Sequence, residues 1–192
     1  MACTLRSHPR PERFLTGRML LRELVAELTG ADLASITIAA TCADCGREHG
    51  QSRIAGHPEV HVSLSHTGGR TAAAATVGTA TVGTAIGGTA IGVDIERRDA
   101  SPTRLAAILK IASGADLAHW TRVEAVLKAD GRGLRVDPRA VQVIGDLATL
   151  EGVGYALTDA SDDRHTISVA TALAETALGR PRQVGGDQPG VE

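Results

Sequence analysis

Ile91-Gly92-Val93-Asp94-Ile95-Glu96 alternates apolar and acidic residues with the two-residue period of a β-strand. Val93 and Ile95 therefore face one side of the strand, and Asp94 and Glu96 face the other. Two carboxylates on one face repel each other unless a positive charge lies between them. Mg²⁺ binds such oxygen ligands, together with waters and substrate phosphate. The stretch predicts a cation site on a strand, and the alternative is a strand end with two solvated acids.

A second stretch, Trp120 to Leu134, predicts a helix that carries a third carboxylate, because its apolar residues recur at helical spacing. Glu124 and Lys128 are four residues apart and share a face, which is also typical of a stabilising surface pair. Of the 20 basic residues, only Lys110 and Lys128 are lysines. A lysine can release its proton when its pKa is lowered, whereas an arginine effectively never does. The use of lysine here favours a role in acid–base chemistry.

Four stretches, in this order along the chain, are similar to the motifs of one known family. They are Arg13–Arg22, Val60–Gly69 with its Ser-His-Thr-Gly ending, Gly92–Glu96 and Trp120–Leu134. Together they resemble the 4′-phosphopantetheinyl transferases of the surfactin-synthetase type, over residues 10 to 172. The resemblance implies the fold of that family, a pseudo-dimer of two similar α+β halves with the active site between them.

The resemblance also implies an activity, that of a holo-acyl-carrier-protein synthase. Such an enzyme moves the phosphopantetheine arm of coenzyme A onto a serine of an apo acyl or peptidyl carrier protein and releases adenosine 3′,5′-bisphosphate. Residues 1–98 would form the N-terminal half and residues 99–178 the C-terminal half, in a monomer. The composition of residues 179–192, rich in Gly, Pro and Gln, predicts a disordered tail.

Carried over residue by residue, the resemblance implies that Asp94, Glu96 and Glu124 hold Mg²⁺ against the pyrophosphate of coenzyme A. Glu124 would accept the proton of the carrier serine, directly or through water. Lys128 would steady or protonate the leaving phosphate. Phosphoryl transfer depends on positioning and charge neutralisation of this kind more than on covalent chemistry.

Further residues would bind coenzyme A itself. Ser65 and His66 would contact its adenosine end, with His66 near the 3′-phosphate, and Arg13 would make a second phosphate contact. The family's Gly-Lys/Arg-Pro loop reads Gly50-Gln51-Ser52-Arg53 in this chain. Gln51 therefore lacks the phosphate-binding charge, and Arg53 is expected to supply it.

Two other positions differ from the family pattern. Val123 stands where the family often has a lysine, and the segment 97–119 is shorter than in typical members. These differences leave an alternative open, in which the chain binds coenzyme A or a carrier protein without transferring anything.

The apolar periodicity of the whole chain predicts helices and mainly antiparallel strands, hence an α+β class. Helices are predicted over residues 10–29, 102–110 and 116–129. Strands are predicted over residues 36–40, 60–64, 71–77, 90–95, 140–144, 154–157 and 166–172, with the third and fourth of these paired to each other. Between those two, a five-residue repeat of the type Thr-Val-Gly-Thr-Ala fills residues 76–90 and predicts an expanded hairpin loop.

Length and composition narrow the classes of function. A chain of 192 residues with 43% hydrophobic residues can bury a sizeable core. A net charge of −2 gives no reason to expect nucleic acid or an anionic membrane as a partner. The charged start lacks a following apolar run, so no signal peptide is predicted and a cytoplasmic location is expected. The uncharged run from Thr71 to Val93 is too rich in Ala, Gly and Thr for a membrane span.

The cysteines offer a separate metal hypothesis. The count is three, including Cys3, which does not favour disulfides in a cytosolic chain. Cys42-Ala-Asp-Cys45-Gly-Arg-Glu-His49 contains three residue types that bind zinc, with His57 or His61 as a fourth. Without a second cysteine pair, free thiols in a turn are the favoured interpretation. A small zinc module that binds nucleic acid is a third alternative, which the charge disfavours.

Overall fold

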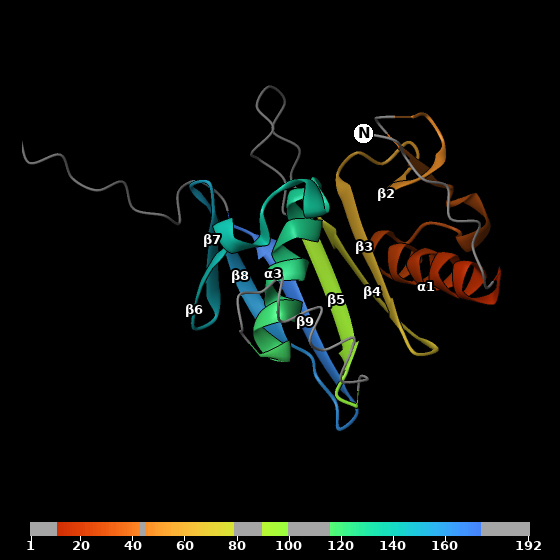
Figure 1. Ribbon diagram of the computed structural model, residues 1–192. Coiled ribbons are helices and arrows are strands. Elements are labelled where there is room, and N and C mark those ends of the chain that lie inside the picture. The colour runs from red at the N-terminus through yellow and green to blue at the C-terminus, as the bar shows by residue number, and fades with distance from the viewer. Residues whose placement is uncertain (1–10, 43–44, 79–89, 100–115, 174–192) are drawn as a thin grey trace, which may run out of the picture.

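The computed structural model describes residues 11–42, 45–78, 90–99 and 116–173 and shows a mixed α+β fold (Figure 1). Each helix is followed by a run of strands that pair antiparallel, so the predicted α+β class is confirmed. The predicted helix 102–110, most of the repeat at 76–90 and the predicted tail 179–192 lie outside the described residues. None of the helices in the described ranges has both the length and the apolarity required to cross a membrane.

The N-terminal part contains one long helix and two β-hairpins. Its elements are α1 (Pro11–Thr29), η1 (Leu33–Ser35), β1 (Ile38–Thr41), β2 (Glu48–Ile54), β3 (Val60–Thr67) and β4 (Arg70–Val77). β1 pairs with β2 and β3 pairs with β4, both antiparallel. Leu21 and Val25 of α1 are completely buried against apolar residues of β1, β2 and β3, which form one core cluster.

The C-terminal part is an antiparallel sheet covered by a helix. Its elements are β5 (Ile91–Arg97), α3 (Leu117–Asp130), η2 (Gly133–Arg135), η3 (Pro138–Ala140), β6 (Gln142–Ile144), β7 (Leu147–Leu150), β8 (Val153–Asp159) and β9 (His165–Ala172). The strand order is β5-β9-β8-β7-β6, and α3 lies across one face of this sheet (Figure 1). The apolar side of α3, with Val123 and Leu127, packs on Leu150 and Tyr155 to form the largest core cluster.

The predicted helices 10–29 and 116–129 are confirmed, and so is each predicted strand apart from shifts at its ends. The predicted pairing of residues 71–77 with residues 90–95 is wrong. A tight turn at Gly68-Gly69, both with positive φ, folds β4 straight back onto β3 along its whole length. β5 instead pairs with β9 over all seven of its residues.

β5 therefore belongs to the sheet of the C-terminal part, although it lies within residues 1–98. Hydrogen bonds between β5 and β9 cross the predicted boundary between the halves at residues 98 and 99. On the other side, β5 packs against the first part through a small apolar cluster in which Ala74 of β4 meets Ile91 and Val93. This position places β5 between the two parts of the molecule, and it is the strand that carries the predicted cation site.

Candidate functional site

The three carboxylates that the sequence singles out meet in space. Asp94 and Glu96 lie on β5, and Glu124 lies on α3. One carboxylate oxygen from each of the three residues lies within 4.8 Å of the others. Asp94 and Glu96 are only 1% and 5% exposed, so this is a buried acidic cluster and not a solvated surface. The alternative of two solvated acids at a strand end is therefore excluded.

The cluster forms because α3 approaches β5 unusually closely. A Cβ atom added to Gly92 would lie 1.9 Å from the carbonyl oxygen of Ala125 and 2.5 Å from the amide nitrogen of Ala129. Glycine is therefore required at residue 92 for this helix–strand contact. Asp116 caps the start of α3 by accepting the His119 backbone N–H at 2.7 Å, and this cap fixes where the helix begins.

A second contact fixes the rotation of α3 over the sheet. Thr121, which the motif shares with the family, is fully buried, and its hydroxyl lies 2.9 Å from the hydroxyl of Ser168 on β9. Ser168 is the register partner of Asp94 across the β5–β9 ladder. The pair therefore anchors the helix beside the strand position that carries the buried aspartate.

Hydroxyl groups of β3 line the other side of the cluster. Ser63, Ser65 and Thr67 alternate along β3 and are all buried, so all three face β5. The Ser63 hydroxyl accepts the Val93 backbone N–H at 3.0 Å. Ser65 donates to Asp94 at 2.7 Å, and Thr67 donates to Glu96 at 3.3 Å. β3 and β5 are thus joined by side-chain hydrogen bonds, and we call these three residues the hydroxyl seam.

Asp94 has one satisfied and one unsatisfied carboxylate oxygen. Its Oδ1 accepts hydrogen bonds from the Ser65 hydroxyl at 2.7 Å and from Lys128 Nζ at 2.6 Å. Its Oδ2 is buried and has no hydrogen-bond partner among the described residues. A buried carboxylate oxygen without a donor is costly, and such an oxygen calls for an explanation such as a bound cation.

Lys128 connects the helix to the strand and to the seam. Its ammonium donates to Asp94, to the Ser65 hydroxyl at 2.8 Å and to the Val93 carbonyl at 3.1 Å. The lysine side chain is 28% exposed and the aspartate side chain 2%. Lys128 is therefore part of the cluster and not half of a surface ion pair with Glu124.

The negative charge of Glu124 is costly in this environment. Burial, the charge of Asp94, a hydrogen bond with Asp94 and the charge of Glu96 together raise the pKa of Glu124 to about 8, although the positive charge of Lys128 lowers it. Three carboxylates and one ammonium leave the cluster with an excess of negative charge. A divalent cation would remove both the repulsion and the unsatisfied oxygen of Asp94.

The donor set fits a hard cation and not a soft one. The ligand atoms are carboxylate oxygens, which Mg²⁺ prefers, without sulfur or imidazole. It is the one group of at least three potential metal ligands found within residues 11–42, 45–78, 90–99 and 116–173. Cys42 and Cys45 form no such group with other described residues, and the side chain of His49 lies outside them.

The residues expected to bind coenzyme A are divided between three places. Ser65 belongs to the acidic cluster, as described above. His66 projects from the opposite face of β3, where its ring lies against Gly17 of α1 and its Nδ1 lies 2.9 Å from the Thr71 hydroxyl. Arg13 is one turn before Gly17 on α1, and its Nε is buried without a partner among the described residues.

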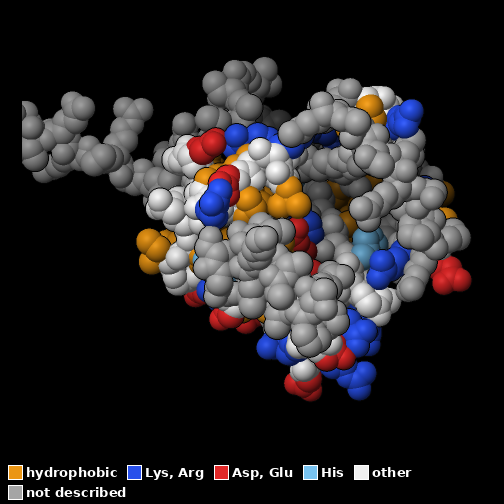
Figure 2. Space-filling view, in the orientation of Figure 1, with side chains coloured by type: hydrophobic (Ala, Val, Ile, Leu, Met, Phe, Trp, Pro, Cys, Tyr) orange, Lys and Arg blue, Asp and Glu red, His pale blue; other side chains and the backbone are white. Residues whose placement is uncertain are grey.

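Arg53 lies in the third place, apart from the other two. It is exposed on β2 and borders a 380 Å³ cavity together with His61, whose pKa is lowered by burial and by the charge of Arg53. A neighbouring 250 Å³ cavity is lined by Gln51, Gly131 and Lys128. The two cavities share Gln51, so together they extend from the acidic cluster toward Arg53. Figure 2 shows acidic and basic side chains within the hollow between the α3 side and the α1 side of the molecule.

Sequence reasoning missed two residues of the site, Ser63 and Thr67. The sequence does contain a signal for them, because hydroxyl residues occur at every second position of Ser63-Leu64-Ser65-His66-Thr67. In a strand this spacing places all three on one face. The face that they would meet could not be inferred, because the pairing of β5 was predicted incorrectly.

Comparison with known protein families, with curated proteins and with solved structures finds no match to this chain. The family resemblance therefore depends on the motif residues alone. The geometry of the acidic cluster stands independently of it.

Proposed function

We propose that this protein is a Mg²⁺-dependent 4′-phosphopantetheinyl transferase that acts on an apo acyl or peptidyl carrier protein. The observation that carries the proposal is the buried cluster of Asp94, Glu96 and Glu124 with Lys128 beside it. These four residues come from the two motifs that resemble the family. The family's pseudo-dimer fold, a monomeric state and a cytoplasmic location are parts of the same proposal.

Asp94, Glu96 and Glu124 would hold the Mg²⁺ ion, and the unsatisfied Oδ2 of Asp94 supports this assignment. The ion would supply charge neutralisation for the pyrophosphate of coenzyme A. The two cavities that reach from Lys128 toward Arg53 offer space for the rest of coenzyme A. Arg13 and His66, on the α1 side of β3, remain candidates for contact with its 3′-phosphate.

The reaction forms one bond and breaks one. The hydroxyl oxygen of the carrier serine bonds to the pantetheine-side phosphorus, and the pyrophosphate bond to adenosine 3′,5′-bisphosphate breaks. Glu124 takes the serine proton, directly or through one water.

Lys128 would steady the leaving phosphate. In the arrangement described here, its three N–H donors are all used by Asp94, Ser65 and the Val93 carbonyl. The proposal therefore requires Lys128 to exchange one of these bonds for a phosphate oxygen. The same observation favours the second candidate function, a protein that binds coenzyme A or a carrier without transfer, in which Lys128 only holds Asp94 in place.

Intact-protein mass spectrometry tests the proposal. Apo acyl and peptidyl carrier proteins are incubated with the protein, coenzyme A and Mg²⁺, with and without chelator. The expected result is the mass of one added phosphopantetheine, which chelator abolishes. Asp94→Asn and Glu124→Gln should reduce the rate by at least about a hundredfold. Glu27→Gln, which alters an exposed glutamate of α1, should leave it unchanged.

No added mass with any carrier, from folded protein, would contradict transfer. Titration calorimetry with coenzyme A then tests the second candidate function. Saturable binding of coenzyme A without transfer would support the second candidate function. The absence of both transfer and coenzyme A binding would contradict both candidate functions.

A further inference from the structure

A basic cavity of 460 Å³ lies at the end of β5, beyond the acidic cluster. Three segments form it: the turn between β3 and β4, the end of β5, and the loop that leads into β9. Its charged lining consists of four arginines and two aspartates, Arg70, Arg97, Arg98, Arg164, Asp99 and Asp163. Figure 2 shows basic side chains at this end of the molecule with a few acidic ones among them, and the whole chain carries a net charge of −2.

The arginine nearest the acidic cluster is held in place by its surroundings. Arg97 follows Glu96 directly, and its guanidinium makes two hydrogen bonds with Asp99, of 2.7 Å from Nε and 2.5 Å from Nη2. A Cβ atom on Gly68 would lie 2.3 Å from Cδ of Arg97. The stem of Arg97 therefore crosses the β3–β4 turn at Gly68, where no side chain stands in its way.

The loop that leads into β9 is also fixed. The Asp162 carboxylate accepts the backbone N–H groups of Arg164 and His165 at 2.7 and 2.6 Å. The backbone N–H of Arg98 donates to the Arg164 carbonyl at 2.9 Å, which joins the loop to the end of β5. His165 is 6% exposed, and its Nδ1 lies 3.0 Å from Asp162. The cavity is therefore built on ordered backbone and a buried histidine.

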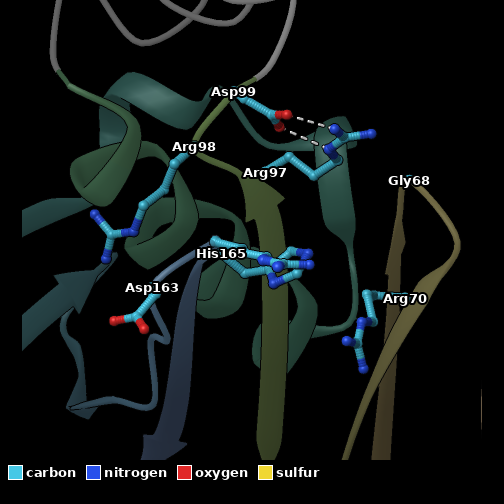
Figure 3. A pocket seen from close by; sticks show the side chains of 8 residues that line it. Gly68, Arg70, Arg97, Arg98, Asp99, Asp163 and His165 are labelled. Atoms are coloured by element: carbon cyan, nitrogen blue, oxygen red, sulfur yellow. Dashed lines mark hydrogen bonds and ion pairs between the residues drawn. The ribbon is translucent and has the colours of Figure 1, made fainter.

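Two arginines of the cavity retain their hydrogen-bonding capacity. Arg70 and Arg164 are exposed, and neither side chain has a hydrogen bond or ion pair with another residue of the described ranges. Figure 3 shows Arg97 and Arg70 on one side of His165, and Arg98 directed to the other side. Arginines from different segments thus line one cavity.

This chemistry matches one class of ligand. The lining residues are charged or polar apart from Gly68, and no aliphatic side chain is among them. Such a cavity offers little to an apolar group. Guanidinium groups in several directions suit the oxygens of a phosphate dianion better than the two oxygens of a carboxylate. We propose that this cavity binds the phosphate group of a small phosphomonoester, independently of the acidic cluster and of the proposed transferase activity.

Isothermal titration calorimetry of the full chain at constant ionic strength, with chelator present, tests this inference. The probes are glycerol 3-phosphate and inorganic phosphate, with acetate as the carboxylate control. We expect saturable binding of both phosphate probes, and at least tenfold weaker binding by Arg70→Ala/Arg164→Ala. Arg47→Ala/Arg139→Ala removes the same charge from exposed arginines elsewhere and should bind within about twofold of the wild type.

Three outcomes would overturn the inference. They are no saturable binding up to about 10 mM, equal weakening in both double variants, and acetate binding as tightly as phosphate. Two further probes identify the source of the phosphate group. Binding of a phosphoserine peptide, or of vesicles that contain phosphatidic acid, without binding of glycerol 3-phosphate would reject a small-molecule ligand.

Discussion

Asp94 is the residue on which most of the candidate site depends. It is 1% exposed, its Oδ1 is shared by Ser65 and Lys128, and its Oδ2 has no donor among the described residues. A buried ion pair is expensive to form and still more expensive to break from one side. The two donors on Oδ1 therefore orient the carboxylate, so that Oδ2 is the oxygen left for a cation. Ser65 is in this sense a positioning residue for the metal ligand.

We expect Ser65→Ala to weaken Mg²⁺ binding by roughly tenfold, because the charge-assisted bond that orients Asp94 is worth about 1.5 kcal/mol. Ser63→Ala is the matched control. Ser63 is buried to the same extent on the same face of β3, but its hydroxyl bonds the Val93 backbone and no carboxylate. Titration calorimetry with Mg²⁺ measures both variants. Equal loss of affinity in the two would show that the seam acts only on the fold.

Glu124 couples the acidic cluster to pH. In the folded, metal-free protein, burial and then the charge of Asp94 raise its pKa to about 8, against an ordinary value of 4.5 in the unfolded chain. Between these values the folded state binds the proton and the unfolded state does not. The stability that this proton contributes is fully present below pH 4.5 and is lost as the pH rises through about 8.

Denaturation in chelator at about pH 5 and about pH 9 checks this expectation. The wild type should lose a few kcal/mol of unfolding free energy between these two pH values, because each unit of difference between the folded and unfolded pKa corresponds to about 1.4 kcal/mol. Glu124→Gln should lose less and should be the more stable protein at the higher pH. Glu27→Gln keeps Glu124 and removes an exposed carboxylate, so it should lose as much unfolding free energy as the wild type. Identical pH profiles for Glu124→Gln and the control would show that Glu124 does not cause the loss of stability. In the wild type, Mg²⁺ should restore the lost stability at high pH.

At the scale of the element, β5 and α3 act as one unit because of Gly92. No other described glycine is approached as closely by backbone atoms, with the Ala125 carbonyl 1.9 Å from the position of an added Cβ. Backbone atoms of a helix cannot move aside as the end of a side chain can. The separation of α3 from β5 sets the distance between Glu124 and Asp94.

Gly92→Ala should therefore destabilise the protein by at least about 3 kcal/mol, because the methyl group forces the helix off the strand. Gly17→Ala provides a contrast on α1. There an added Cβ meets only the side-chain atoms of Leu64 and His66, at 3.2 Å, and alanine favours the helix. Urea denaturation should find Gly17→Ala within about 1 kcal/mol of the wild type. If Gly92→Ala were equally mild, the close approach of α3 would be wrong.

The helices and strands also show what the sequence can and cannot predict. The periodicity of α1, α3 and most strands was sufficient to locate them, because it reports which residues are buried. It does not report which strand is the partner, so the pairing of residues 71–77 with residues 90–95 was wrong. β2 was missed because Glu48-His-Gly-Gln-Ser-Arg is polar at every position before Ile54. Spacing marked Asp94 and Glu96 as a pair of carboxylates on one strand face, and the family resemblance added Glu124. Thr67 could be assigned to the site only once the neighbouring strand was known.

At the scale of the whole molecule, β5 joins the N-terminal and C-terminal parts. β5 lies within residues 1–98, yet its backbone hydrogen bonds are made with β9. The first part meets it through the hydroxyl seam and through the apolar cluster around Ala74 and Val93. No backbone ladder joins β3 or β4 to β5 in the described residues. The two parts of the molecule are thus joined through β5, which pairs with the second part and contacts the first.

Through the hydroxyl seam, a cation bound at the acidic cluster would affect the contact between the two parts of the molecule. Ser65 and Thr67 belong to the first part of the molecule, while the carboxylates that they hold belong to the second. An ion that fixes those carboxylates also holds in place the acceptors of the Ser65 and Thr67 hydrogen bonds, and we therefore expect it to strengthen the contact between two parts that would otherwise unfold separately. Differential scanning calorimetry should show two overlapping transitions in chelator and one sharper, higher transition in Mg²⁺. In Ser65→Ala the two transitions should persist even in Mg²⁺. A single transition for the metal-free wild type would contradict this expectation, because the apolar cluster alone would then make unfolding cooperative.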